Sequence, residues 1–164
     1  MSARDAWEYA SFVITTLALP FAIVFFAWEQ RKERDNEDEE AYQLLSDAYN
    51  DFLKVVLAHP DLHLRTNEPL PDPSAEQRER MMVIFDMLVS LFERAYLVAF
   101  KDAMTETERR RWNSWDDYMR EWCRRKDFHD MLPLLLSGED PEFQKYLRRI
   151  AEEERGPLID PTQE

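Results

Sequence analysis

Three polar side chains inside a mainly apolar stretch are spaced so that they could take part in acid–base chemistry. Asp86, Ser90 and Glu93 follow one another by four and three residues, so on a helix they share one stripe. Two carboxylates beside a buried face are typical of acid–base chemistry, because burial shifts their pKa values. No histidine or nucleophile with a matching spacing accompanies them. A solvent-facing stripe, or an ion pair with an arginine of another helix, is therefore the favoured interpretation.

The other reactive residue types form no recognisable constellation. Cys123 and His129 are a conceivable nucleophile and base, but a helix end is expected between them and no third group orients them. A buried thiol and a surface histidine are expected instead. His59 and His63 have the spacing of two metal ligands on a helix, but Pro60 breaks that helix. We therefore predict no catalytic residue, no cofactor and no bound metal.

Three tryptophans recur at helical spacing near the middle of the chain. Trp112, Trp115 and Trp122 fall on one stripe, which can form a cage for a cation or a stacking surface for nucleobases. Such a stripe is more often part of a core. The net charge of −13 repels nucleic acid. We expect a core aromatic stripe and no nucleic-acid partner.

Residues 9–28 contain no charged side chain. A helix of this length spans roughly 30 Å, the thickness of the hydrocarbon core of a bilayer. Trp7 and Tyr9 at one end and Trp28 at the other mark the two interfaces, where amphipathic aromatic rings are favoured. Pro20 predicts a kink in mid-span. A buried core helix and a cleaved signal peptide are the alternatives, and a start that is not net basic disfavours the second.

The charges that flank this stretch predict its orientation. Arg31, Lys32 and Arg34 follow it closely, whereas Arg4 alone precedes it. Basic flanks remain in the cytoplasm, and the single cysteine excludes an internal disulfide, which suits a reducing compartment. We expect a single-pass protein of the cell membrane with a cytoplasmic C-terminal domain.

All elements after the span are expected to be helices. Residues 29–40 are charged and contain no helix breaker, and their acidic run lacks the glycine turn of a calcium loop, so they predict a helical linker. Proline-rich residues 60–73 predict a loop. Four amphipathic helices are predicted over residues 41–59, 75–101, 106–126 and 141–154, with a short helix before Ser137-Gly138.

Capping signals and composition predict the organisation of the chain. Ser74 with Gln77 and Thr105 with Glu108 are capping boxes, and Asp140 precedes a proline suited to a first helical turn. The fold class is all-α, with one N-terminal transmembrane helix, a long helix and a small bundle of about four helices. The predicted parts are a flank and transmembrane helix (1–28), a linker (29–40), a cytoplasmic helical domain (41–155) and a mobile tail (156–164).

The order of aromatic landmarks carries a family resemblance. The landmarks are Phe92-Glu93, Trp112-x-x-Trp115, Trp122, Asp140-Pro141-Glu142-Phe143 and Tyr146. Together with the membrane helix, this order resembles uncharacterised prokaryotic families of single-pass, membrane-tethered helical domains. The resemblance implies this architecture and transfers no activity and no functional residue.

The first functional hypothesis is a membrane-anchored interaction or regulatory module. Its expected partners are the lipid bilayer and either another protein or further copies of the chain. An oligomeric membrane effector or small channel component, built from several helices kinked at Pro20, is the alternative. A membrane-tethered enzyme is a second alternative, which the absence of a nucleophile–base or metal constellation disfavours.

Overall fold

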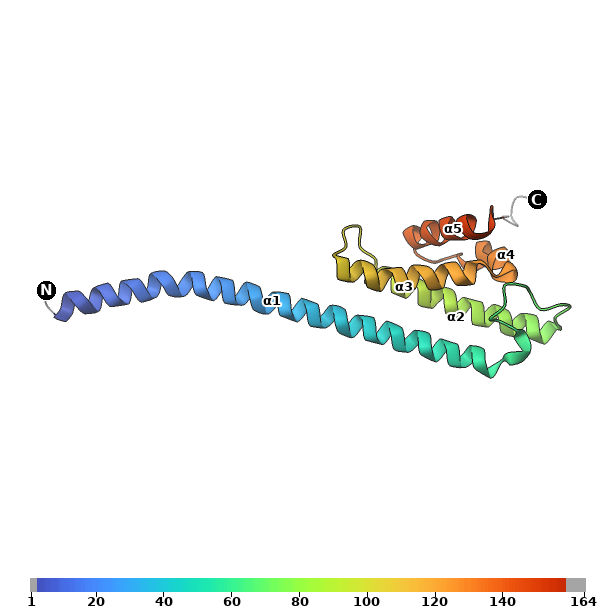
Figure 1. Ribbon diagram of the computed structural model, residues 1–164, viewed down its shortest axis with the longest axis horizontal. Coiled ribbons are helices and arrows are strands. Elements are labelled where there is room, and N and C mark those ends of the chain that lie inside the picture. The colour runs from blue at the N-terminus through green and yellow to red at the C-terminus, as the bar shows by residue number, and fades with distance from the viewer. Residues whose placement is uncertain (1–2, 159–164) are drawn as a thin grey trace. The chain divides into compact units, whose positions relative to one another are not determined.

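The computed structural model describes the backbone of residues 3–158 and the side chains of residues 23–33 and 36–158. Within these residues every regular element is a helix, which confirms the all-α fold class. The elements are α1 (Ala3–Ala58), the 3-10 turn η1 (Pro60–Leu62), α2 (Ala75–Ala99), α3 (Glu106–Cys123), α4 (Lys126–Leu135) and α5 (Pro141–Arg155) (Figure 1). The chain divides into two compact units, Met1–Ala41 and Tyr42–Glu164.

Three helices begin at the residues that the capping patterns predict. Ser74 Oγ accepts the backbone N–H of Gln77 at 3.1 Å, and the Gln77 side chain accepts the backbone N–H of Ser74 at 3.0 Å. Thr105 and Glu108 make the same reciprocal pair. The Asp140 carboxylate accepts two backbone N–H groups in the first turn of α5. Each cap satisfies donors that a helix start otherwise leaves unpaired.

Helix α1 joins the predicted span, the predicted helical linker and the first predicted helix of the bundle in one element. It runs without interruption from Ala3 to Ala58, through the predicted linker. The physical reason is that residues 29–58 contain neither glycine nor proline, so nothing ends the helix. The boundary between the two units falls within α1.

The predicted membrane span is only partly covered by the described side chains. Within the residues whose side chains are described, no helix is both long enough and apolar enough to cross a bilayer. The side chains of residues 9–22 of the predicted span, which include Tyr9 and Pro20, lie outside the described part, and so does that of Trp7. Residues 159–164 of the predicted tail also lie outside the described part.

The helix predicted over 106–126 corresponds to α3, which ends three residues earlier, and the short helix predicted before Ser137-Gly138 corresponds to α4. Helix α3 ends at Cys123, and Arg125 takes an extended conformation with φ −75° and ψ 124° before α4 begins. The described bundle therefore contains the four predicted helices and the predicted short helix. Helix α4 continues through Pro133 to Leu135, and α2 ends at Ala99 because Phe100 is extended.

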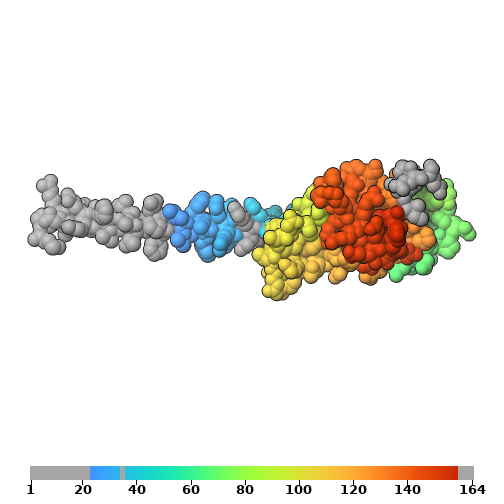
Figure 2. Space-filling view, turned by 90° about the horizontal axis from the view of Figure 1, so that it is seen from above, coloured from blue at the N-terminus to red at the C-terminus, as the bar shows by residue number. Residues whose placement is uncertain are grey.

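The second unit has one contiguous hydrophobic core, to which α1 to α5 all contribute. The C-terminal part of α1 supplies Leu45, Tyr49, Phe52 and Val56, whose heptad-like spacing predicts this buried face. Helix α5 packs chiefly on α3 and covers the face of the bundle that is seen from above (Figure 2). Its location leaves the other side of α2 uncovered by α5.

The loop between α1 and α2 is more ordered than its prolines predict. Leu62 and Leu64 are buried in the core, and neither was predicted as a core residue. His63 between them adopts a left-handed conformation with φ 51°, which reverses the chain after the 3-10 turn. The two leucines anchor the loop from inside.

Candidate functional site

An open groove lies between α1 and α2 within the second unit. Its volume is about 590 Å³. Helix α1 contributes Ala48, Asp51, Phe52 and Val55 to its lining. Helix α2 contributes Val83, Asp86, Met87, Ser90, Leu91 and Arg94. Apolar side chains form most of the lining, and a few charged groups lie among them, which is the usual character of a binding groove.

The outer face of α2 is unusually apolar for a surface helix. Its exposed large hydrophobic residues have 37–59 % of their surface accessible: Met82, Val83, Met87, Leu97 and Val98. The inner face of the same helix is fully occupied by the core. Neighbouring exposed apolar side chains on one helix indicate a surface that another molecule covers.

The structure separates the three residues of the predicted polar stripe. Asp86 and Ser90 line the groove. Glu93 is directed instead toward the start of α5, where its Oε1 accepts the backbone N–H of Asp140 at 2.5 Å. The stripe is therefore divided between a groove and a contact that joins α2 to α5.

The contact with α5 includes a second carboxyl group. Burial raises the pKa of Glu139 to about 7, and a hydrogen bond to Glu93 and the negative charges of Glu93 and Asp86 act in the same direction. Protonated Glu139 can thus donate a hydrogen bond to Glu93 near neutral pH. No histidine or cysteine contacts this pair among the described residues, so the arrangement joins helices and offers no nucleophile.

The tryptophan stripe lies in the core. Trp112, Trp115 and Trp122 have at most 5 % of their surface accessible. Trp122 Nε1 donates to the Tyr49 hydroxyl at 3.3 Å, and Trp112 Nε1 donates to the Tyr146 hydroxyl at 3.0 Å. The three rings are buried, the indole N–H groups of Trp112 and Trp122 are paired, and Arg65 of the same chain lies over Trp122 at 5.8 Å from the ring centroid. The stripe therefore leaves no open surface for a ligand cation or a nucleobase.

Neither Cys123 nor His129 has the environment of a catalytic group. Burial raises the pKa of the Cys123 thiol, so the nucleophilic thiolate does not form near neutral pH. His129 is buried, which corrects the expectation of a surface histidine, and its Nε2 lies 3.0 Å from the carbonyl oxygen of Gly156. In the described part of the chain, no group of three His, Cys, Asp or Glu side chains could hold a metal ion.

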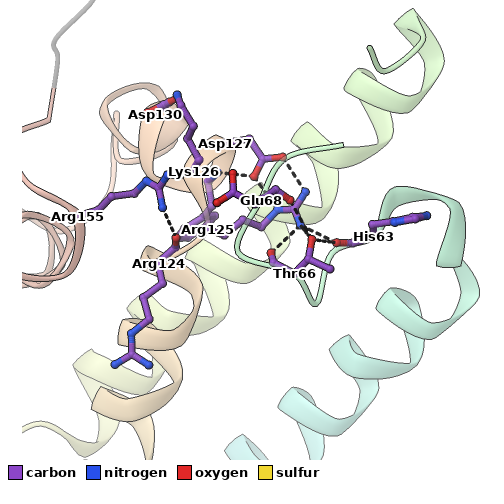
Figure 3. Close-up of polar contacts among 10 residues, drawn as sticks. His63, Thr66, Glu68, Arg124, Arg125, Lys126, Asp127, Asp130 and Arg155 are labelled. Atoms are coloured by element: carbon purple, nitrogen blue, oxygen red, sulfur yellow. Dashed lines mark hydrogen bonds and ion pairs between the residues drawn. The ribbon is translucent and has the colours of Figure 1, made fainter. Parts of the chain in front are cut away.

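A buried arginine, Arg125, lies between the α1–α2 loop and the start of α4 (Figure 3). One terminal nitrogen of Arg125 donates to the carbonyl oxygens of His63 and Thr66 at 2.7 and 3.0 Å. Its other terminal nitrogen and its Nε lie 2.8 and 2.6 Å from the two carboxylate oxygens of Asp127. Paired in this way, a guanidinium can be buried, and it holds the α1–α2 loop against the junction of α3 and α4.

Comparison with known proteins adds no family to this description. No protein-family model, no curated protein and no solved structure matches the chain.

Proposed function

We propose that the chain is a membrane-anchored helical module that binds a helix of another protein chain in the groove between α1 and α2. The groove is the observation that carries the proposal, because it combines an open apolar trough with neighbouring exposed apolar side chains on α2. An amphipathic helix is the kind of ligand that such a groove accepts. The charged groups Asp86 and Arg94 would fix its orientation.

The proposed anchor is the uncharged stretch of residues 9–28. Its described side chains agree with a lipid environment, since Ile23, Val24, Phe25, Phe26 and Trp28 all have at least 60 % of their surface accessible. Lys32 Nζ lies 5.8 Å from the centroid of the Trp28 ring. A cation beside a tryptophan after an apolar run is typical of a membrane interface. The basic flank supports a cytoplasmic location for the second unit.

Anchoring is tested with charges placed in the proposed span. Each arginine near the centre of a membrane helix costs roughly 3 kcal/mol, so Leu17→Arg with Leu19→Arg should release the full chain from membranes. The matched control, Leu57→Arg, changes an exposed α1 residue outside the span. We expect the wild type and the control to resist alkaline extraction from membranes. A wild-type chain that remains in the soluble fraction would overturn the anchor.

Docking in the groove is tested by photocrosslinking in the native membrane. A photoreactive amino acid replaces Met87 in the groove and, as the control, exposed Arg110 on α3. We expect a protein adduct from position 87, and its loss when Val83→Glu places a charge in the groove. Equal adduct yields at the two positions would refute docking in the groove.

A further inference from the structure

We infer that the helix bound in the groove is α2 of a second copy of this chain, packed antiparallel about a two-fold axis at Ser90. The inference rests on the proposed function and specifies its partner. In a two-fold antiparallel pair, the residue n places before the axis meets the residue n places after it. The outer face of α2 can therefore be checked for complementarity with itself.

The apolar residues of this face are symmetric about Ser90. Val83 lies seven residues before Ser90 and Leu97 seven after it, and both are exposed. Met82 and Val98 lie eight residues before and after Ser90 and are also exposed. An antiparallel pair centred on Ser90 consequently sets apolar against apolar at four levels, and water is excluded at each of them.

The two charged residues that α2 contributes to the groove are antisymmetric about the same point. Asp86 lies four residues before Ser90 and Arg94 four after it, so each would meet its opposite on the partner, twice per dimer. Within the described chain neither side chain makes an ion pair of its own. A parallel pair of α2 helices would instead set Asp86 against the partner's Asp86 and Arg94 against the partner's Arg94. Like charges at those positions disfavour the parallel arrangement.

The centre of the face suits close approach of two helices. Ser90 is small and exposed, and it lies in the groove between the larger side chains Met87 and Arg94. Small residues at a crossing point let helix backbones approach closely. Ala48 and Val55 of α1 border the groove, where they would contact the flank of the partner's α2. Helix α2 therefore lines the groove in its own copy and binds in the same groove of the second copy.

The two-fold axis is tested by crosslinking a residue to its own copy. The full chain in native membranes carries Cys123→Ala, to remove the buried thiol, together with Ser90→Cys. Mild oxidation should join two copies at this position much faster than at Leu57→Cys, the exposed control on α1. Mixing a Val83→Cys chain with a Leu97→Cys chain should give a covalent heterodimer. Crosslinking of Ser90→Cys at the control rate would overturn the inference.

Charge reversal tests the pairing of Asp86 with Arg94. Asp86→Arg alone should weaken dimerisation by about tenfold or more, because like charges then meet at both levels. The double change Asp86→Arg with Arg94→Asp should restore the dimer, which a merely structural role of either residue would not do. Both residues are exposed in the single chain, so the far-UV circular dichroism spectra of the variants should match that of the wild type and report an intact fold.

Failure of this inference is distinguishable from failure of the proposed function. If photocrosslinking at Met87 captures a different protein while Ser90→Cys gives no dimer above the control, the docking groove stands and the second copy is excluded. If the groove gives neither an adduct nor a dimer, both proposals fall. A dimer that the charge swap does not restore would contradict the antiparallel register.

Discussion

Among the charged side chains that the structure describes, we expect the loss of Arg125 to lower the free energy of unfolding most. Arg125→Met would leave the Asp127 carboxylate and two loop carbonyls without their donor, a loss of about 3–5 kcal/mol for a broken buried pair. Urea unfolding of the variant and the wild type measures this loss of unfolding free energy. The control is Arg124→Met, whose half-exposed side chain pairs with Glu154 and should cost no more than about 1 kcal/mol. Equal losses for the two variants would show that the loop is not held by Arg125.

Glu139 should give the fold a pH dependence near neutrality. Its pKa is about 7 in the folded state against 4.5 in the reference state, so the folded chain binds more protons between these values. The stabilisation is complete below pH 4.5 and is lost as the pH rises through 7. Its size is on the order of 1 kcal/mol after allowance for solvent exposure.

Glu139→Gln should remove this dependence, because the amide keeps a donor for Glu93 at every pH. The measurement is the urea midpoint between pH 5 and 8, with exposed Glu142→Gln as the control. Within this window the low pKa of Glu108, about 2, contributes no slope. A wild-type midpoint that rises from pH 5 to 8 would contradict the assignment.

At the scale of elements, α3 owes its position to its buried tryptophans. Trp115 has 2 % of its surface accessible and packs edge-on against Tyr49 with ring centroids 5.8 Å apart. Trp115→Ala should cost about 3–5 kcal/mol of unfolding free energy, as for other large-to-small core changes. Arg110→Ala, on the exposed side of the same helix, should change it by less than about 0.5 kcal/mol. A loss below about 1 kcal/mol at Trp115 would mean that the stripe is open to a ligand.

The elements also show which structural features a sequence reveals. The helix starts at Ser74, Thr105 and Asp140 were predictable because a cap depends on residues within one turn. The helix end between Cys123 and His129 was also expected, but the burial of Arg125 there was not, because its acceptors lie some 60 residues away in the chain. The buried Leu62 has the same explanation. Features that depend on residues within one helical turn can be predicted from the sequence, whereas burial by distant segments of the chain cannot.

The groove was partly predictable for the same reason. Helical spacing places Asp86, Ser90 and Glu93 on one stripe, and α2 indeed carries them on neighbouring faces. Only the packing of α5 decides that Glu93 serves as a contact to Asp140 while Asp86 and Ser90 remain open. The apolar residues beside them gave no signal of exposure, since Val83 and Met87 resemble core residues by type.

At the scale of the whole molecule, we propose that anchoring and binding are carried out by different stretches of the chain. Residues 9–28 are the proposed anchor, and the groove of the second unit is the proposed binding surface. The proposed anchoring would confine the second unit to a membrane surface and raise its effective concentration toward any partner confined to the same surface. A modest apolar groove can then be occupied without high intrinsic affinity.

Protection of the groove in the native membrane tests the central claim most directly. Met87→Cys in a Cys123→Ala chain is treated with a maleimide in native membranes and again after dilution into detergent, and Leu57→Cys serves as the control. A covered groove predicts that Met87→Cys reacts more slowly in membranes than after dilution, while the rate at Leu57→Cys does not change. Equal rates for Met87→Cys under both conditions would contradict a groove that binds a partner helix.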